Sequence, residues 1–217
     1  RFKSRDDHVN LSGWIITPSG ELKADDSGQN NRWIVIVHGH GTNRADPVFG
    51  SLSLVRELHR AGFAVLMFDL RASGQSPGNR GSAGYDEQRD LHGALDFLGH
   101  FGVSPRQVGI LGYSIGGAIG LLVSSRSDRV ASVVADSSFA DLALMVKHGA
   151  AKRFKLLNVF MPGMRLAVRL LYGFDIGWIS PVQALETNTR PVMLIHGELD
   201  SVVPMINFRM LSRVIEG

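Results

Sequence analysis

The chain has 217 residues, of which 44% are hydrophobic and 20% charged, a balance that excludes a disordered chain and predicts one globular domain over residues 1–217. It contains no cysteine, which excludes a disulfide-stapled scaffold, cysteine-ligated metal sites and a cysteine nucleophile. Its formal net charge of +3 is too small to predict a nucleic-acid surface, and no apolar run approaches the ~20 residues of a membrane span.

Short apolar segments alternate with longer helical patterns along the chain. Strands are expected at residues 9–16, 33–38, 64–68, 108–111, 130–135 and 192–196, and helices at 47–61, 86–100, 115–124 and 205–215. Asp46 and Pro47 are expected to begin the first helix, because a capping side chain followed by proline suits a first turn. The alternation predicts an α/β fold, with a mostly parallel, doubly wound sheet covered by helices on both faces.

The start of the chain bears on its compartment. It reads RFKSRDD, with neither an initiating methionine nor the apolar stretch of a signal peptide, so we interpret the chain as a trimmed or processed product. The lack of cysteine fits a cytoplasmic location and is also compatible with export or with a membrane anchor ahead of the trimmed start.

The pattern changes between residues 141 and 189, where the sequence becomes long, apolar and basic, and we expect a helical insertion over one end of the sheet. Six basic and two acidic residues lie between Asp141 and Ser180. These charges are most simply those of a solvated face, but they could also attract an anionic substrate or rest on an anionic membrane surface. Phe160 and Met161 are expected to contact a hydrophobic substrate group.

Gly112-Tyr113-Ser114-Ile115-Gly116 is a G-x-S-x-G pattern between an expected strand and an expected helix. A strand that turns abruptly into a helix exposes the serine hydroxyl, and glycines at 112 and 116 let strand and helix approach closely. We interpret Ser114 as a nucleophile and expect Tyr113 to contact the substrate; the alternative is a glycine-rich turn that only packs the helix. The spacing excludes a dinucleotide-binding G-x-G-x-x-G loop and a P-loop.

His38-Gly39-His40-Gly41 directly follows the apolar residues WIVIV. A backbone N–H of this loop, paired with the N–H of Ile115 at the positive end of a helix, would form an oxyanion hole. The alternative is a metal site on His38 and His40. Alternate residues of a strand face opposite ways and no third ligand is nearby, so no metal or other cofactor is expected.

His196-Gly197-Glu198-Leu199-Asp200 follows the last expected strand. A carboxylate on such a loop can orient a catalytic histidine and stabilise its charged form, which makes Asp200 the candidate acid. Its alternative role is to cap the helix that follows Pro204. Asp136, after the strand at 130–135, is the second candidate for the acid.

These motifs together resemble the α/β-hydrolase fold family of serine hydrolases, from about Leu11 to the end of the chain. The matching pieces are HGHG, DLRASGQS, GYSIGG and HGELDSVVP. The resemblance implies a role for each of these residues: Ser114 as the nucleophile, Asp200 as the triad acid, the backbone N–H groups of His40 and Ile115 as oxyanion donors, and 141–189 as a cap inserted after the sixth strand.

Two features depart from the family's pattern. Ala72 stands where the family more usually has glycine, which affects the shape of a loop. More seriously, the family's catalytic histidine follows the acid in the chain, and this sequence ends at Gly217 without one. We therefore expect the last strand and its histidine loop to be missing. His148 is the alternative base, and the remaining candidates are interpreted as structural: His92, His100 and His196.

The motifs predict a metal-independent serine hydrolase that cleaves carboxylic esters, with a hydrophobic acyl group, through an acyl-enzyme on Ser114. Two alternatives stay open: a serine peptidase of the dipeptidyl or acylaminoacyl type on the same fold, and a non-catalytic binding protein that lacks the base. Dehalogenase and epoxide-hydrolase chemistry is disfavoured, because in similar folds it uses an aspartate at the position of Ser114.

Overall fold

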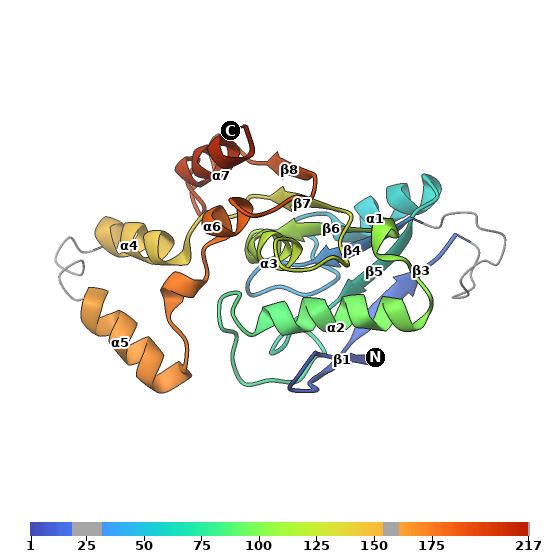
Figure 1. Ribbon diagram of the computed structural model, residues 1–217, viewed down its shortest axis with the longest axis horizontal. Helices are drawn as coiled ribbons and strands as arrows, with labels where there is room; N and C mark the ends of the chain where they lie inside the picture. Colours follow the sequence, from blue (N-terminus) through green and yellow to red (C-terminus); the bar gives the residue numbers. More distant parts are fainter. Residues whose placement is uncertain (19–31, 154–160, 217) are drawn as a thin grey trace.

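The computed structural model describes residues 1–18, 32–153 and 161–216 (Figure 1). Its centre is a six-stranded sheet in the order β3-β5-β4-β6-β7-β8. The strands are β3 (Gly13–Ile16), β4 (Trp33–Val37), β5 (Ala64–Phe68), β6 (Val108–Tyr113), β7 (Ser132–Asp136) and β8 (Val192–Ile195). β3 runs antiparallel to β5, and the other neighbours are parallel, so the prediction of a mostly parallel sheet is confirmed.

Helices cover both faces of this sheet, as predicted. They are α1 (Ser51–Arg60), α2 (Glu87–His100), α3 (Ile115–Ser124), α4 (Leu142–Arg153), α5 (Met161–Tyr172), α6 (Pro181–Leu185) and α7 (Ile206–Glu216), with 3-10 turns η1 (Pro105–Gln107) and η3 (Ile176–Trp178). Val35 and Val37 of β4 share a buried cluster with α2 and α3, whereas Ile36 between them packs in a second cluster with Val55 of α1. The strand alternation therefore divides the core between the two faces.

The edge strand expected at residues 9–16 is divided in two. Asn10 and Leu11 form β2 (Asn10–Leu11), which pairs with β1 (Phe2–Lys3) in a separate small sheet. The interruption falls at Ser12, whose backbone N–H donates to Ser76 Oγ at 2.9 Å instead of to a strand. A side chain 64 residues away thus ends the strand pattern that the sequence suggested.

The helix expected at residues 47–61 starts later, at Ser51, so the predicted start was wrong. Asp46 does receive a hydrogen bond from a backbone N–H, that of Val48 at 2.8 Å, but it closes a local turn rather than capping a helix. Gly50 follows with a φ of 60°, a left-handed conformation that separates this turn from α1.

The segment expected as an insertion, residues 141–189, falls into two parts. Figure 1 shows α4 and α5 set apart from the sheet, beyond the end at which β7 leads into α4. The second part returns to the body: Phe174, Ile179 and Leu185 belong to the main buried cluster, and α6 packs against α3 and α7. We call α4 and α5, residues 142–153 and 161–172, the helical arm.

No helix in the described ranges has the length and apolar character to cross a bilayer.

Candidate active site

Ser114 occupies a strained corner between β6 and α3. Its φ of 52° and ψ of −116° lie in a region that non-glycine residues rarely adopt. Its backbone N–H donates to the Asp136 carbonyl oxygen at 2.8 Å, which fixes the corner against β7. The side chain is half-buried, and within the described residues its hydroxyl makes no hydrogen bond. The hydroxyl is therefore free to react or to bind.

Two glycines make this corner sterically feasible. A Cβ on Gly112 would lie 2.5 Å from the Gly117 nitrogen, and one on Gly116 would lie 2.7 Å from the His38 carbonyl oxygen. Real Cβ atoms essentially never approach backbone atoms so closely, and the contacted atoms are backbone atoms of α3 and of the loop that follows β4. Glycine at both positions is therefore a requirement of the packing between β4, β6 and α3.

The loop after β4 lies directly beside Ser114. Val37, the last residue of β4, is in register with Gly112 of β6, so the two strands end side by side. A Cβ built on Gly39 would lie 3.7 Å from the Ser114 Cβ. Within the described residues, the backbone N–H groups of His40 and Ile115 donate no hydrogen bond. Two unbonded backbone N–H groups therefore belong to residues next to this corner: Ile115 follows Ser114, and His40 follows Gly39.

A cavity of about 100 Å³ adjoins this loop. Its walls come from the loops after β4 and β5, from the start of α2 and from α3, and its lining residues are His38, Gly39, His40, Gly41, Leu70, Arg71, Ala72, Ser73, Gly81, Glu87 and Ile115. The carboxylate of Glu87 accepts hydrogen bonds from the Ser82 backbone and hydroxyl and from the Gly84 N–H. The guanidinium of Arg71 pairs with Asp90 and Asp7. Both charged groups that border the cavity thus already have partners within the protein, Arg71 in ion pairs and Glu87 in hydrogen bonds.

His38 holds the loop after β4 to the loop after β5. The ring is buried, its Nε2 accepts the Leu70 N–H at 3.0 Å, and its Nδ1 lies 2.7 Å from the Gly39 carbonyl oxygen. These partners place the proton on Nδ1 and leave the ring neutral. Burial lowers the pKa of His38 below its usual 6.5, against the opposing effects of the Gly39 carbonyl and Asp69. With both nitrogens engaged, His38 offers no free lone pair to a metal.

A buried ion pair fixes the same loop from its other end. Asp69, directly after β5, pairs with the Arg44 guanidinium and accepts the Arg44 backbone N–H at 2.8 Å. The Gln75 N–H donates to the second carboxylate oxygen of Asp69, and the Gln75 side-chain oxygen accepts from Arg44 at 2.8 Å. Trp14 stacks 4.3 Å from the guanidinium carbon. We call Arg44, Asp69 and Gln75 the loop clamp.

The acid loop follows β8, two strands from Ser114 in the sheet. Asp200 Oδ1 accepts the backbone N–H groups of Val202 and Val203, both at 2.8 Å, so the carboxylate closes the turn that precedes α7. Its Oδ2 lies 3.9 Å from His196 Nε2, and that ring nitrogen is 2.7 Å from the Val203 carbonyl oxygen. Asp200 therefore has a structural role through Oδ1, and its Oδ2 remains available for another partner.

The second candidate acid, Asp136, is nearer to the serine in the sheet. It is in register with Tyr113, and its carboxylate accepts the Ser137 hydroxyl at 3.0 Å. The Tyr113 ring is buried and stacks on Phe49 with centroids 4.5 Å apart. Burial, reinforced by the charges of Asp136 and Asp46, raises the pKa of Tyr113 to about 12. Tyr113 thus packs in the core beneath the serine.

The remaining candidates lie elsewhere. In the described part of the chain no histidine is hydrogen-bonded to Ser114. His92 and His100 lie on α2. Phe160 and the side chains of His148 and Met161 fall outside the described residues.

A comparison with known families adds to this geometry. The model of a family described as alpha/beta hydrolase fold matches residues 32–163, which include the loop after β4 and the corner at Ser114. The chain belongs to the alpha/beta hydrolase fold family. Uncharacterized protein YfhR of Escherichia coli K12 is 32% identical over 203 residues, covering 91% of this chain. The chain spans 61% of the length of that relative.

Solved structures show the same hydrolase fold. The esterase Pf2001 of Pyrococcus furiosus matches with a TM-score of 0.75 and 22% identity, over 100% of this chain and 77% of that one. The acylaminoacyl peptidase of Pyrococcus horikoshii matches with a TM-score of 0.69 and 20% identity, over 100% of this chain and 34% of that one. At these identities the likeness shows the fold.

The loop clamp is the part of the candidate site that the sequence analysis does not predict. The sequence presents Asp69 only as the first residue of DLRASGQS and assigns Arg44 no role. The available signal is that Asp69 directly follows one apolar strand, that Arg44 lies in the loop after another, and that the two strands end at the same edge of the sheet. Buried charges are usually paired, so a basic and an acidic residue at such positions predict a buried ion pair.

Proposed function

We propose that this chain is a serine hydrolase that cleaves carboxylic esters through an acyl-enzyme on Ser114. The observation that carries the proposal is the free Ser114 hydroxyl, held in a strained corner beside the unbonded N–H groups of His40 and Ile115. A nucleophile and two preorganised donors around one point are what acyl transfer requires.

In the proposed reaction the Ser114 oxygen bonds to the acyl carbon while its proton passes to a base. The carbonyl oxygen takes the negative charge and accepts hydrogen bonds from the His40 and Ile115 N–H groups. The intermediate collapses, the ester C–O bond breaks, and the leaving alkoxide takes the proton from the base. Water then attacks the acyl-enzyme by the same route, which releases the acid and restores the Ser114 hydroxyl.

The base and its acid partner are assigned as part of the proposal. We assign the base to a histidine outside the described side chains, either His148 or one that the complete protein supplies beyond residues 1–217. Asp200 would orient it through the carboxylate oxygen that the turn leaves available. The helical arm would act as the cap over the cleft.

The cavity beside the loop after β4 indicates the kind of group that binds there. It is small. The Arg71 guanidinium at its border is paired with Asp90, and the Glu87 carboxylate accepts hydrogen bonds from uncharged groups of Ser82 and Gly84. An uncharged group on one side of the ester therefore fits better than a carboxylate, which would lack a counter-charge there. This favours neutral esters as substrates.

A serine peptidase is the second candidate, because a peptidase shares this fold at a TM-score of 0.69. A peptidase of the dipeptidyl type must pair the substrate's ammonium group with a carboxylate, whereas one of the acylaminoacyl type takes an uncharged, acylated N-terminus. The buried Glu87 carboxylate already accepts three hydrogen bonds from its own loop, which argues against the dipeptidyl type. The acylaminoacyl type is separated from an esterase only by the substrate test.

The test compares the complete protein with three variants on short p-nitrophenyl esters and on aminoacyl p-nitroanilides. Ser114→Ala is expected to lower ester kcat by at least about 10³-fold, as loss of a serine nucleophile does. Ser137→Ala is the matched control, since Ser137 also follows a strand with φ 53° but donates its hydroxyl to Asp136. His148→Ala decides whether the arm supplies the base.

Ester turnover that survives in Ser114→Ala would refute the proposal. Faster cleavage of the anilides than of the esters would favour the peptidase. No turnover of either class by the complete protein would indicate a non-catalytic binding protein.

A further inference from the structure

Helix α5 of the helical arm carries exposed leucines that no described residue covers. On α5, Leu166, Leu170 and Leu171 are 58%, 75% and 72% exposed. Tyr172 at the end of the helix and Trp178 in η3 are about half exposed, at 46% and 51%. Exposed apolar patches of this kind, rimmed by polar residues, mark surfaces that bind a partner or a membrane.

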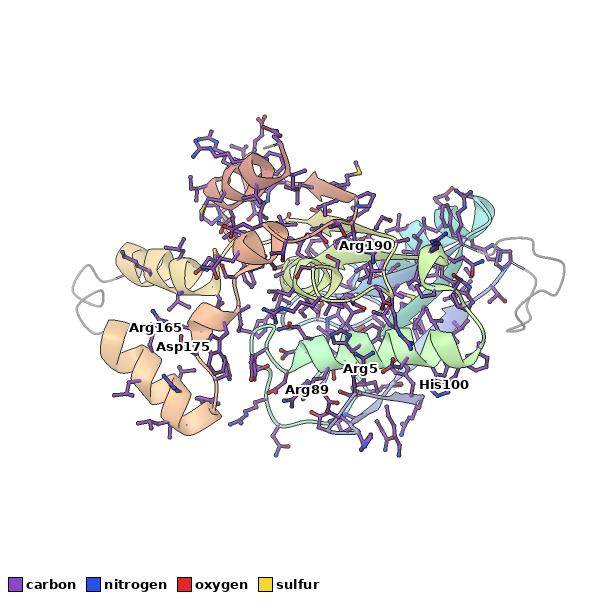
Figure 2. The ribbon with its side chains drawn as sticks, in the orientation of Figure 1. Arg5, Arg89, His100, Arg165, Asp175 and Arg190 are labelled. Atoms are coloured by element: carbon purple, nitrogen blue, oxygen red, sulfur yellow. The ribbon has the colours of Figure 1, made fainter. Side chains whose placement is uncertain are left out.

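The helix is held in a fixed orientation with this surface outward. Val168, on the side of α5 opposite Leu166 and Leu170, is half-buried and packs against the main core. The Arg165 guanidinium lies 2.8 Å from Asp175, and Figure 2 shows the two side chains together where α5 meets the following segment. The guanidinium of Arg80 stacks 4.6 Å from the Tyr172 ring. The exposed leucines are thus a defined face and not the consequence of an unanchored helix.

A basic stripe runs beside the leucines. Arg165 and Arg169 are four residues apart, as are Leu166 and Leu170, so the two pairs form adjacent rows on the helix surface. Both arginines are exposed, and the segment from Asp141 to Ser180 carries six basic and two acidic residues. A helix with leucines on one face, arginines beside them and aromatic rings at its end has the composition of helices that lie in a membrane interface.

The arginines of α5 also argue against a second copy of this chain as the partner that covers the leucines. A two-fold interface would bring the same face of both copies together and set the arginine rows against a surface of equal charge. An anionic bilayer supplies the opposite charge, and its acyl boundary receives the leucines while the arginine stems extend toward the headgroups. Charge complementarity therefore favours the lipid surface.

We infer that α5 is a docking surface for an anionic phospholipid bilayer, with Leu166, Leu170 and Leu171 inserted and Arg169 at the headgroups, while Arg165 keeps its ion pair with Asp175. This inference is independent of the proposed catalysis, because it needs only the exposed face of the arm.

The experiment is co-sedimentation of the complete protein with phosphatidylcholine vesicles, with and without phosphatidylserine. We expect binding to the anionic vesicles that weakens with salt, and little binding to the neutral ones. The double variant L166S/L170S is expected to lower the partition coefficient at least about tenfold, since both inserted side chains are lost. The control is Leu52→Ser, an exposed leucine on α1. Arg169→Glu should weaken anionic binding, and Arg56→Glu on α1 should not.

A second measurement guards against misfolding of the serine variants. The chain has no cysteine, so Leu170→Cys can be labelled uniquely with an environment-sensitive fluorophore. We expect a blue shift on anionic vesicles for this label and none for the same label at Leu52→Cys. The inference would be overturned by equal binding to neutral and anionic vesicles or by unchanged binding of L166S/L170S. It would also be overturned if the label at Leu170→Cys showed no blue shift on anionic vesicles. A concentration-dependent dimer that L166S/L170S abolishes would do so as well, by making the face an interface between copies.

Discussion

The corner at Ser114 and the helical arm differ in how closely their sequences are tied to their surroundings. Around Ser114 even a methyl group on Gly112 or Gly116 would collide with the backbone, and buried hydrogen bonds fix the adjoining loop. In the arm, a methyl group on Gly163 would meet open space, and leucines face outward. The corner at Ser114 is closely packed and hydrogen-bonded, whereas the arm exposes apolar side chains as a surface. Substitutions should therefore have opposite consequences in the two regions.

The largest contrast is expected between two glycine-to-alanine substitutions. Gly116→Ala should lower the free energy of unfolding by at least about 3 kcal/mol or prevent folding, because its Cβ cannot fit against β4. Gly163→Ala should raise it by about 0.5–1 kcal/mol, since alanine favours the helix and has room in α5. Urea unfolding followed by circular dichroism measures both. Similar effects of the two substitutions would erase the distinction between corner and arm.

A buried and an exposed ion pair give the next contrast. Arg44→Met leaves the buried Asp69 carboxylate without its partner and should cost about 3–5 kcal/mol of stability. At temperatures where the variant is folded, we expect kcat for esters to fall more than KM rises, because the clamp positions the loop that carries the His40 N–H. Arg56→Met, at an exposed pair with Glu57, should cost less than about 1 kcal/mol.

The conservative variant Arg44→Lys separates positioning from stability. Lysine restores the positive charge beside Asp69, so this variant should recover part of the stability. It lacks the bidentate guanidinium geometry that holds the loop, so its kcat should stay low. Full recovery of kcat with lysine would show that charge alone at this position is sufficient.

A change of pH is expected to alter the free energy of unfolding less than these substitutions do. Burial lowers the pKa of His92 to about 4 and that of His38 below 6.5, so in the unfolded chain both rings take up protons at higher pH than in the folded protein. Stability is therefore lost as the pH falls through 6.5, the unfolded value, toward the folded values. His92→Leu should flatten the fall in urea midpoint between about pH 7.5 and 5.5, and His59→Leu, at an exposed position, serves as the control. A midpoint that rises on acidification would contradict this sign.

Local residue patterns predicted the strands and helices whose own composition determines where they begin and end. The apolar run at 64–68 and the small-residue run at 115–124 became β5 and α3 with the predicted bounds. Where long-range contacts decide, prediction failed. The strand expected to end at residue 111 continues to Tyr113, because β7 extends beside it as far as Asp136.

The candidate site divides in the same way. The strained corner could be anticipated because its glycines and serine are neighbours in sequence. The loop clamp joins Arg44 to residues 25 and 31 positions away, which a linear pattern does not connect. The hydrogen bonds of Asp200 to Val202 and Val203 depend on the shape of one turn, which the sequence HGELDSVVP leaves undefined.

The most direct test of the central claim is to treat the complete protein with a fluorophosphonate probe and to locate the adduct by peptide mass spectrometry. The account predicts one covalent adduct on the peptide that contains Ser114, absent in Ser114→Ala and present in Ser137→Ala. An adduct on another serine, or equal labelling of Ser114→Ala, would contradict it.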